Sequence, residues 1–271
     1  MAKQRSLRHE YQLFVEREIE AYKDSVSRST LLALGDEAVA ALGAQAQTTL
    51  TEMVLWEEVD RIIVERLRVP GFATWSRRRR RHLAALRDAG RCGLAPDGVV
   101  ASALRAAAGD HVLLAGGSAE QATLFSAAHG CNVTVLADAP ESLDRLFAAA
   151  DDAGVGSQVR GCVCGLGGWD PDVPFRVVVC APDTLGPLSA AERALAMRGL
   201  QEATPVGGVH LLHEPHGPGD RKSVEITFDE WRSWYPGWSV SSDAPAGASS
   251  ADGVRGATLI ARRTHDLVPA R

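Results

Sequence analysis

The stretch over residues 111–138 constrains the fold of this chain more than any other part of the sequence. It contains an apolar run (112–115), the small residues Gly116, Gly117 and Ser118, a segment with apolar residues at helical spacing, and a second apolar run (133–137). A strand, a tight glycine turn and a helix that leads to a second parallel strand form the opening unit of a doubly wound α/β domain. Such domains bind nucleotide-like ligands where the first strand ends. We therefore expect a ligand crevice at the end of the first apolar run.

Strand and helix patterns alternate along the rest of the C-terminal part. Apolar runs predict strands at 111–116, 132–137, 158–164, 175–181, 208–213, 237–242 and 255–262. Helical spacing predicts helices between the earlier strands, at 119–129, 140–153 and 189–203. No helix separates the last two strands, so we expect them to form an antiparallel hairpin at the sheet edge. The sequence thus predicts an α/β fold with a seven-stranded, mainly parallel sheet and helices on both faces.

The N-terminal part contains helical patterns and no strand candidate. Helices are predicted at 7–22, 29–42 and 51–69, and a further short helix at 99–107 leads into the first strand. We therefore expect an N-terminal helical region over 1–94 and an α/β domain over 95–271.

Five consecutive arginines occupy positions 77–81. Five successive residues of a helix sweep about 400°, so they cannot all share one solvent face. We expect one or two of them to meet acids such as Glu57, Glu58 or Asp60, or to meet a partner. Nucleic-acid binding is disfavoured, because no aromatic platform or second basic patch accompanies the run and the net charge is −5.

The composition is that of a globular protein, with 45% hydrophobic and 23% charged residues among 271. No apolar run approaches the ~20 residues of a membrane span, and the first residues lack the apolar core of a secretion signal. We expect a soluble, cytoplasmic protein that does not associate with membranes.

The chain has five cysteines, four of which lie in or beside apolar runs: Cys131, Cys162, Cys164 and Cys180. We interpret them as buried, reduced thiols. Cys162 and Cys164 share one strand face, but no second pair follows at zinc spacing, so no metal site is expected.

The predicted layout resembles that of the class I S-adenosylmethionine-dependent methyltransferases. VLLAGGSAEQATLFSAAHGCNVTVL is similar to the first motif of that family, and GCVCGLGGW, RVVVCAPDTLGPLSAAERA and ATPVGGVHLLHE resemble the segments at its third, fourth and fifth strands. The late segment DEWRSWYPGWSVSSD resembles that of small-molecule and tellurite-resistance-like members. The resemblance covers about residues 95–263. It implies a Rossmann-like fold, with S-adenosylmethionine as the cofactor if the site is intact.

The resemblance assigns seven residues to the cofactor site: Gly116, Gly117, Ser118, Glu120, Asp138, Gly165 and Leu166. The first strand of the family ends in an acid, and this chain has Leu114 there. The G-x-G-x-G turn of the family aligns with Gly116, Ser118 and Glu120, so one of its three glycines is present.

Two further acids of the family are replaced. The acid that holds both ribose hydroxyls falls at Ala137, and Asp138 could substitute only if the strand has already ended, because one residue along a strand reverses the side chain. The adenine-contacting acid corresponds to Gly165, which precedes Leu166 where the family often has Asp-Leu. Each lost charge-assisted hydrogen bond is worth ~1.5–3 kcal/mol, so together they predict a degenerate cofactor site.

Other residues of this part could carry chemistry. His210, His213 and His216 follow one another at three-residue intervals, and one of them is a candidate general base. His210 and His213 point to opposite strand faces, so ordinary packing is the alternative. Asp183 follows the fourth strand near the ligand position, although its APDT context differs from the N-P-P-Y motif of nucleic-acid base methylases. The aromatic residues Trp231, Trp234, Tyr235 and Trp238 either pack the late helix against the sheet or line a substrate wall.

Three hypotheses follow. The first is a non-catalytic or repurposed methyltransferase-fold protein that binds a ligand or a partner. The second is an active small-molecule methyltransferase with an atypical cofactor site. The third is a scaffold subunit, or a homo-oligomer, that associates through the N-terminal helices and needs an apolar surface there. The first is favoured, and it is compatible with the third.

Overall fold

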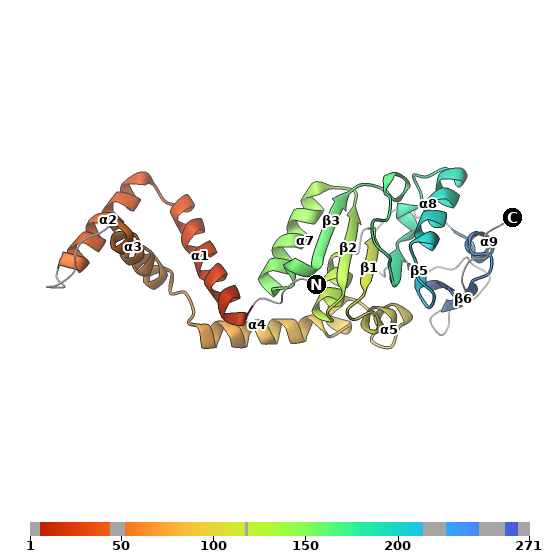
Figure 1. Ribbon diagram of the computed structural model, residues 1–271, viewed down its shortest axis with the longest axis horizontal. Coiled ribbons are helices and arrows are strands. Elements are labelled where there is room, and N and C mark those ends of the chain that lie inside the picture. The colour runs from red at the N-terminus through yellow and green to blue at the C-terminus, as the bar shows by residue number, and fades with distance from the viewer. Residues whose placement is uncertain (1–5, 44–51, 117–118, 214–225, 244–257, 265–271) are drawn as a thin grey trace. The chain divides into compact units, whose positions relative to one another are not determined.

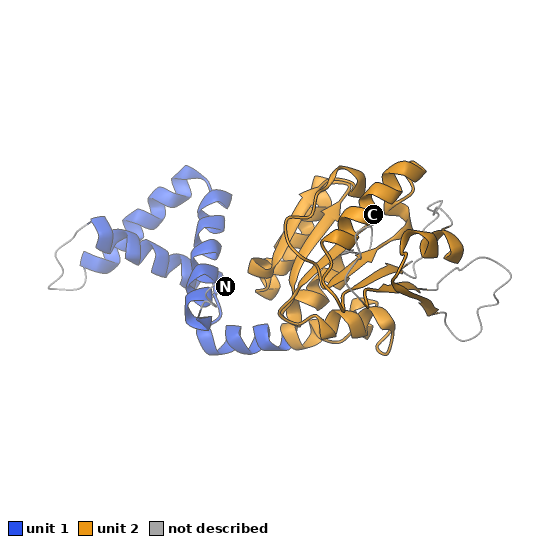
Figure 2. Cartoon of the chain, turned by 45° about the vertical axis from the view of Figure 1, so that its right-hand side comes forward, with its two compact units in different colours: residues 1–81 blue, residues 82–271 orange. Residues whose placement is uncertain are grey.

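The computed structural model describes residues 6–43, 52–116, 119–213, 226–243 and 258–264. The chain divides into two compact units, residues 1–81 and 82–271 (Figure 2). The division falls inside helix α4 (Phe72–Leu86). The border that the helical and strand patterns predict after residue 94 lies just beyond the 3-10 helix η1 (Gly90–Cys92).

The first unit contains helices α1 (Leu7–Ser25), α2 (Arg28–Gly43) and α3 (Glu52–Leu67) and the first part of α4. The Ser6 side chain caps α1 by accepting a hydrogen bond from the backbone N–H of His9. Residues at helical spacing on the first three helices form the core of this unit: Ile19, Leu34, Ala38, Val59, Ile62 and Ile63. The three predicted helices are therefore found, each within three residues of its expected ends.

The arginine run lies on α4, and one member is paired. Arg79 is bonded to Glu10 at 2.6 Å, and its side chain is 11% exposed. The same guanidinium lies over the Trp75 ring, 5.1 Å from its centroid. The prediction that an arginine of this run meets an acid is correct. The acids that we expected were wrong, because Glu58 pairs with Arg61 and Asp60 with Lys23.

The second unit is built on a seven-stranded sheet (Figure 1). Its strands are β1 (His111–Ala115), β2 (Asn132–Ala137), β3 (Val159–Val163), β4 (Val177–Cys180), β5 (Val209–His213), β6 (Ser239–Asp243) and β7 (Thr258–Arg262). Their order is β3-β2-β1-β4-β5-β7-β6. The first five strands are parallel, and β7 is antiparallel to both β5 and β6. The predicted fold class and the reversed last hairpin are both confirmed.

Helices and two apolar clusters cover the two faces of this sheet. The helices are α5 (Val99–Ala106), α6 (Ala119–Ala128), α7 (Pro140–Ala153), α8 (Ala190–Glu202) and α9 (Phe228–Trp234), with the 3-10 turns η2 (Gly156–Gln158), η3 (Leu166–Gly168) and η4 (Pro182–Thr184). Because side chains alternate along a strand, Leu114 joins the cluster that contains α5, α6 and α7 residues, and Leu113 joins the α8 and α9 cluster. The β1 strand is therefore buried on both faces.

Among the helices that the structure describes, none combines the length and the apolar character needed to cross a bilayer.

Candidate functional site

The strand order places a topological switch point at the carboxyl ends of β1 and β4. The connection from β1 leads toward β2 on one side, whereas β4 and β5 extend the sheet on the other side. Open α/β sheets bind their ligands at such a switch point, outside the carboxyl ends of the strands. The segments that follow β1, β2, β3 and β4 therefore form the candidate site.

Gly116 directly follows β1 in a conformation that favours glycine. Its φ is 107°, and a Cβ there would lie 2.7 Å from the Cβ of Ala181 and 2.8 Å from Cγ2 of Thr184. The segment after β4 thus lies against the turn after β1, and a side chain at position 116 does not fit without rearrangement. The two neighbouring candidates, Gly117 and Ser118, lie outside the described residues.

The position of the family's first acid is apolar and buried. Leu114 is 2% exposed, pairs in register with Val135 of β2 and Val179 of β4, and belongs to the α5, α6 and α7 cluster. A carboxylate at this position would need a hydrogen-bonded environment, and the aliphatic neighbours provide none. The end of β1 therefore contributes no acid to the crevice.

Two candidates, Asp138 and Gly165, follow neighbouring strands. The β2 strand ends at Ala137, which pairs with Val163 at the end of β3. Asp138 is exposed and lies beyond the last strand residue. The condition under which Asp138 could replace the missing ribose-binding acid is therefore met, because strand alternation no longer orients its side chain.

Gly165 and Leu166 differ in what surrounds them. A Cβ on Gly165 would meet no atom within 4 Å, so the backbone here leaves open space. Leu166 starts η3 and is buried in the α8 and α9 cluster, so packing accounts for its apolar side chain. Glu120 is exposed in the first turn of α6, where a negative charge interacts favourably with the helix dipole.

The structure brings a different carboxylate to the end of β1. Asp183 lies in η4, and its buried Oδ1 is 3.0 Å from the point that a Cβ of Gly116 would occupy. The neighbouring Thr184 hydroxyl donates a hydrogen bond of 2.6 Å to the carbonyl of Ala181, which shapes this turn. Motif alignment assigns Asp183 no role toward a cofactor. The signal in the sequence that could identify Asp183 is its position directly after a central parallel strand.

His210 belongs to the core. It is buried, and its Nε2 lies 2.7 Å from Oγ1 of Thr204 while its Nδ1 lies 2.8 Å from the hydroxyl of Tyr235. Burial lowers the pKa of His210 to about 3, so the ring is neutral at physiological pH. The packing interpretation of His210 is therefore supported over that of a general base.

The other two histidines occupy different positions. Nδ1 of His213 is 2.9 Å from Oγ1 of Thr258 on the neighbouring strand. His216 lies outside the described residues. Within the described ranges, no group of three His, Cys, Asp or Glu side chains is arranged to hold a metal ion.

Aromatic residues of the late segment pack against His210 and against one another. Trp231, Tyr235 and Trp238 are buried, and the rings of Tyr235 and Trp238 lie 5.5 and 4.9 Å from the His210 ring. These three side chains thus pack α9 and the start of β6 against the sheet, as one of the two interpretations expected.

Comparison with known proteins gives similar folds at low identity. No protein-family model and no curated protein sequence matches the chain. Among solved structures, TehB from Haemophilus influenzae is 16% identical with a TM-score of 0.44, and the match covers 57% of each chain. The S-adenosylmethionine-dependent methyltransferase SibL in its apo form is 17% identical with a TM-score of 0.47, over 93% of this chain and 74% of that chain. The N-methyltransferase NodS from Bradyrhizobium japonicum, in complex with S-adenosyl-L-homocysteine, is 16% identical with a TM-score of 0.41, over 69% of this chain and 85% of that chain.

This chain therefore spans little more than half of the TehB structure. The strand order, with β7 antiparallel between β5 and β6, decides the fold class. This chain has the class I methyltransferase fold. This strand order confirms the fold that the resemblance implies, and TehB-like proteins are among the similar structures.

Two positions that the resemblance assigns to cofactor-binding acids are apolar in this chain. Neither Leu114 nor Ala137 can accept a hydrogen bond through its side chain. Asp138 and Asp183 bring carboxylates to the carboxyl edge of the sheet, but from positions other than those of the family motifs.

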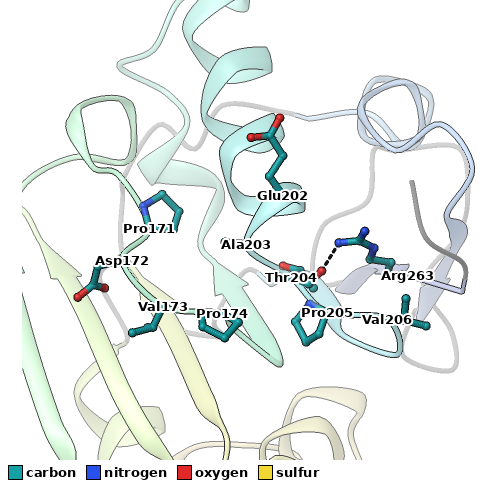
Figure 3. A pocket seen from close by; sticks show the side chains of 10 residues that line it. All are labelled: Pro171, Asp172, Val173, Pro174, Glu202, Ala203, Thr204, Pro205, Val206 and Arg263. Atoms are coloured by element: carbon teal, nitrogen blue, oxygen red, sulfur yellow. Dashed lines mark hydrogen bonds between the residues drawn. The ribbon is translucent and has the colours of Figure 1, made fainter. Parts of the chain in front are cut away.

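A pocket of about 510 Å³ lies at the opposite ends of the strands, beside the amino ends of β4 and β5 (Figure 3). It is lined by Pro171, Asp172, Val173, Pro174, Glu202, Ala203, Thr204, Pro205, Val206 and Arg263. These residues precede β4 and β5 or follow β7. Arg263 donates hydrogen bonds to the carbonyls of Thr204 and Gln201 and so connects the end of β7 to the segment after α8. This pocket is separate from the ligand crevice of the class I fold.

Proposed function

We propose that this protein uses the class I methyltransferase fold without transferring methyl groups, as a repurposed member that binds a ligand or a partner. The observation that carries the proposal is the apolar character of two anchor positions. Leu114 is buried among aliphatic side chains at the end of β1, and Ala137 is the last residue of β2. A sulfonium nucleoside placed in the crevice would lack both of these carboxylates.

The cost of these two replacements is large compared with the affinity of a cofactor site. Two lost charge-assisted hydrogen bonds together weaken binding by about 3–6 kcal/mol, or roughly a hundred- to ten-thousand-fold. A site with a dissociation constant of about 1 μM would then weaken to roughly 0.1–10 mM.

Calorimetric titration with S-adenosylmethionine and S-adenosylhomocysteine tests the proposal. We expect no saturable heat from either compound at micromolar protein concentration. Binding of either compound with a micromolar dissociation constant would refute the proposal. A thermal-shift titration of the same protein provides an independent readout, and the melting temperature should not rise.

The second candidate is an active small-molecule methyltransferase with S-adenosylmethionine held in an atypical way. It is favoured by Asp138, which lies beyond the end of β2, and by Asp183, whose carboxylate lies against the Gly116 turn. Under this hypothesis Asp138→Asn should weaken cofactor binding about tenfold or more, whereas Asp144→Asn, an exposed acid on the adjacent helix α7, should not. Equal affinities of both variants and the wild type would count against a role for Asp138.

Glu120 offers a second test of the same candidate. If its side chain obstructs the cofactor, Glu120→Gly should tighten binding. Glu141→Gly is a matched control, because Glu141 is also an exposed acid in the first turn of a helix that follows a strand. An unchanged affinity in the Glu120 variant would exclude the proposed clash.

For the helical unit, we propose that it binds a protein partner or a second copy of the chain. Met53 and Trp56 on α3 are 72% and 54% exposed, and Leu32 and Val39 on α2 are also exposed. Leu32 and Val39 are seven residues apart and share one face of their helix. Sedimentation of the wild type and of Trp56→Glu should reveal association that the substitution weakens. If both proteins sediment as monomers and no partner is recovered, this role is contradicted. The cytoplasmic location stays a prediction.

A further inference from the structure

Cys162 and Cys164 form a pair of thiols in direct contact. Their sulfur atoms are 2.7 Å apart, with the Cys164 S–H donating to the Cys162 sulfur. A disulfide bond measures about 2.05 Å, so the two sulfurs are already close to bonding distance. All five cysteines are free thiols.

The local backbone explains this contact. Cys162 lies on β3 and Cys164 follows its last residue, Val163, so the two side chains lie on the same face of extended chain. Two residues of extended strand span roughly 6.6 Å between Cα atoms, within the range of about 4.4–6.8 Å found for disulfides. Gly161, by contrast, faces α7, because a Cβ on it would lie 2.7 Å from Leu143.

The pair is accessible. Among the described strands, β3 lies at the edge of the sheet next to β2, and both cysteines are half-buried. The prediction of buried thiols is thus wrong for these two residues, because an edge strand is not covered on its outer side. Cys131 and Cys180 are buried as expected, and Cys92 is buried as well. Burial raises the pKa of Cys131 to about 11 and that of Cys180 to about 12, which makes them poor nucleophiles.

We propose that Cys162 and Cys164 are a reversible dithiol–disulfide couple that exchanges with low-molecular-weight disulfides. Cys162 is the attacking thiol, because its sulfur accepts the S–H of Cys164 and Cys164 is the proton donor of the pair. Burial and the neighbouring Cys162 raise the pKa of Cys164 to about 11, so Cys164 keeps its proton in the first step.

The exchange proceeds in two balanced steps. The Cys162 thiolate attacks one sulfur of oxidised glutathione, its S–S bond breaks, and one glutathione leaves as a thiolate. Cys164 then loses its proton and attacks the Cys162 sulfur of the mixed disulfide, which releases the second glutathione. Two protein thiols are oxidised to one disulfide, and one oxidised glutathione is reduced to two thiols. The resulting ring is small, and strained disulfides of this kind are readily reduced again.

Peptide mapping of the full-length protein tests this proposal. Trypsin cleavage after Arg160 and Arg176 releases peptide 161–176, which contains Cys162 and Cys164 and no other cysteine. The native protein is treated with oxidised glutathione, quenched in acid and alkylated after unfolding. We expect peptide 161–176 to be unalkylated and lighter by the mass of two hydrogen atoms, and dithiothreitol should restore two alkylation sites. The peptides of Cys92, Cys131 and Cys180 should remain alkylated and serve as internal controls.

Two serine variants test the order of the steps. Cys164→Ser should trap glutathione on Cys162, whereas Cys162→Ser should acquire glutathione on Cys164 about tenfold more slowly, since burial raises the pKa of the Cys164 thiol. Serine is nearly isosteric, and the melting temperature of each variant verifies its fold. A wild-type peptide that stays doubly alkylated, or that carries stable glutathione, overturns the proposal. Equal rates in the two variants overturn the assignment of Cys162 as the attacking thiol.

Discussion

Replacement of Gly116 by alanine probes how closely the segment after β4 lies against the end of β1. The backbone at this position has a φ of 107°, and the added methyl group would lie 2.7 Å from the Cβ of Ala181 and 2.8 Å from Cγ2 of Thr184. Both distances are shorter than the normal van der Waals separation of two carbon atoms. The substitution therefore forces a change of backbone conformation or a displacement of η4.

The two effects can be added to give an expected size. A side chain in a sparsely populated backbone region costs about 1–3 kcal/mol, and overpacking by one methyl group costs about 1–3 kcal/mol. We expect Gly116→Ala to lower the free energy of unfolding by about 2–6 kcal/mol. For a domain of this size the melting temperature should fall by roughly 5–20 °C.

Urea unfolding followed by tryptophan fluorescence measures this change, because Trp231 and Trp238 are buried in the same unit. Gly165→Ala is the matched control. It lies at the same edge of the sheet with a φ of −80°, and its Cβ would meet nothing within 4 Å. The control should stay within about 0.5 kcal/mol of the wild type. If Gly116→Ala also stays within that limit, the close approach of η4 to this turn is wrong.

Three further predictions concern the core and the arginine run. His210→Phe leaves the hydroxyls of Thr204 and Tyr235 without their imidazole partner and should cost about 2–4 kcal/mol in urea unfolding, and a loss below 1 kcal/mol would contradict the network. The folded-state pKa of His210, about 3, lies below the ordinary value of 6.5, so the unfolded state binds more protons between these values. The stability that depends on neutral His210 is therefore complete above pH 6.5 and is lost as the pH falls toward 3. This loss should reach about 1.4 kcal/mol per pH unit and be absent in His210→Gln, and equal slopes in both proteins would refute the assignment. Arg79→Ala should destabilise the helical unit by about 1–3 kcal/mol because it leaves Glu10 without its partner, whereas the exposed Arg78→Ala should be nearly neutral; calorimetric unfolding distinguishes the two.

Local sequence signals were sufficient to predict most of the secondary structure. The helix expected at 140–153 is found as Pro140–Ala153, because proline at its start and Gly154 in a left-handed conformation at its end are both encoded by neighbouring residues. The strand at 132–137 is likewise found with the expected ends. Alternation of strands and helices then restricts the topology to few choices, and the hairpin of β6 and β7 follows from the absence of a helix between them.

The side-chain partners could not be predicted in the same way. His210 is bonded to Thr204 and Tyr235, and the latter is 25 residues away in sequence. Arg79 meets Glu10 of another helix, although acids closer in sequence were available. The contact between η4 and Gly116 depends on how the segment after β4 turns, and no local pattern determines that path. These features depend on tertiary packing, so only coordinates reveal them.

The two outermost strands of the sheet have a consequence for the behaviour of the protein at high concentration. The outer edge of a sheet has unpaired N–H and C=O groups and promotes aggregation through intermolecular strand pairing. Both β3 and β6 are only five residues long, and β6 carries three serines and an aspartate. Arg160 and Gly161 on β3 also disfavour a further strand. These short, polar edge strands should therefore disfavour strand pairing between molecules. We expect no aggregation of this kind while the protein is concentrated or stored.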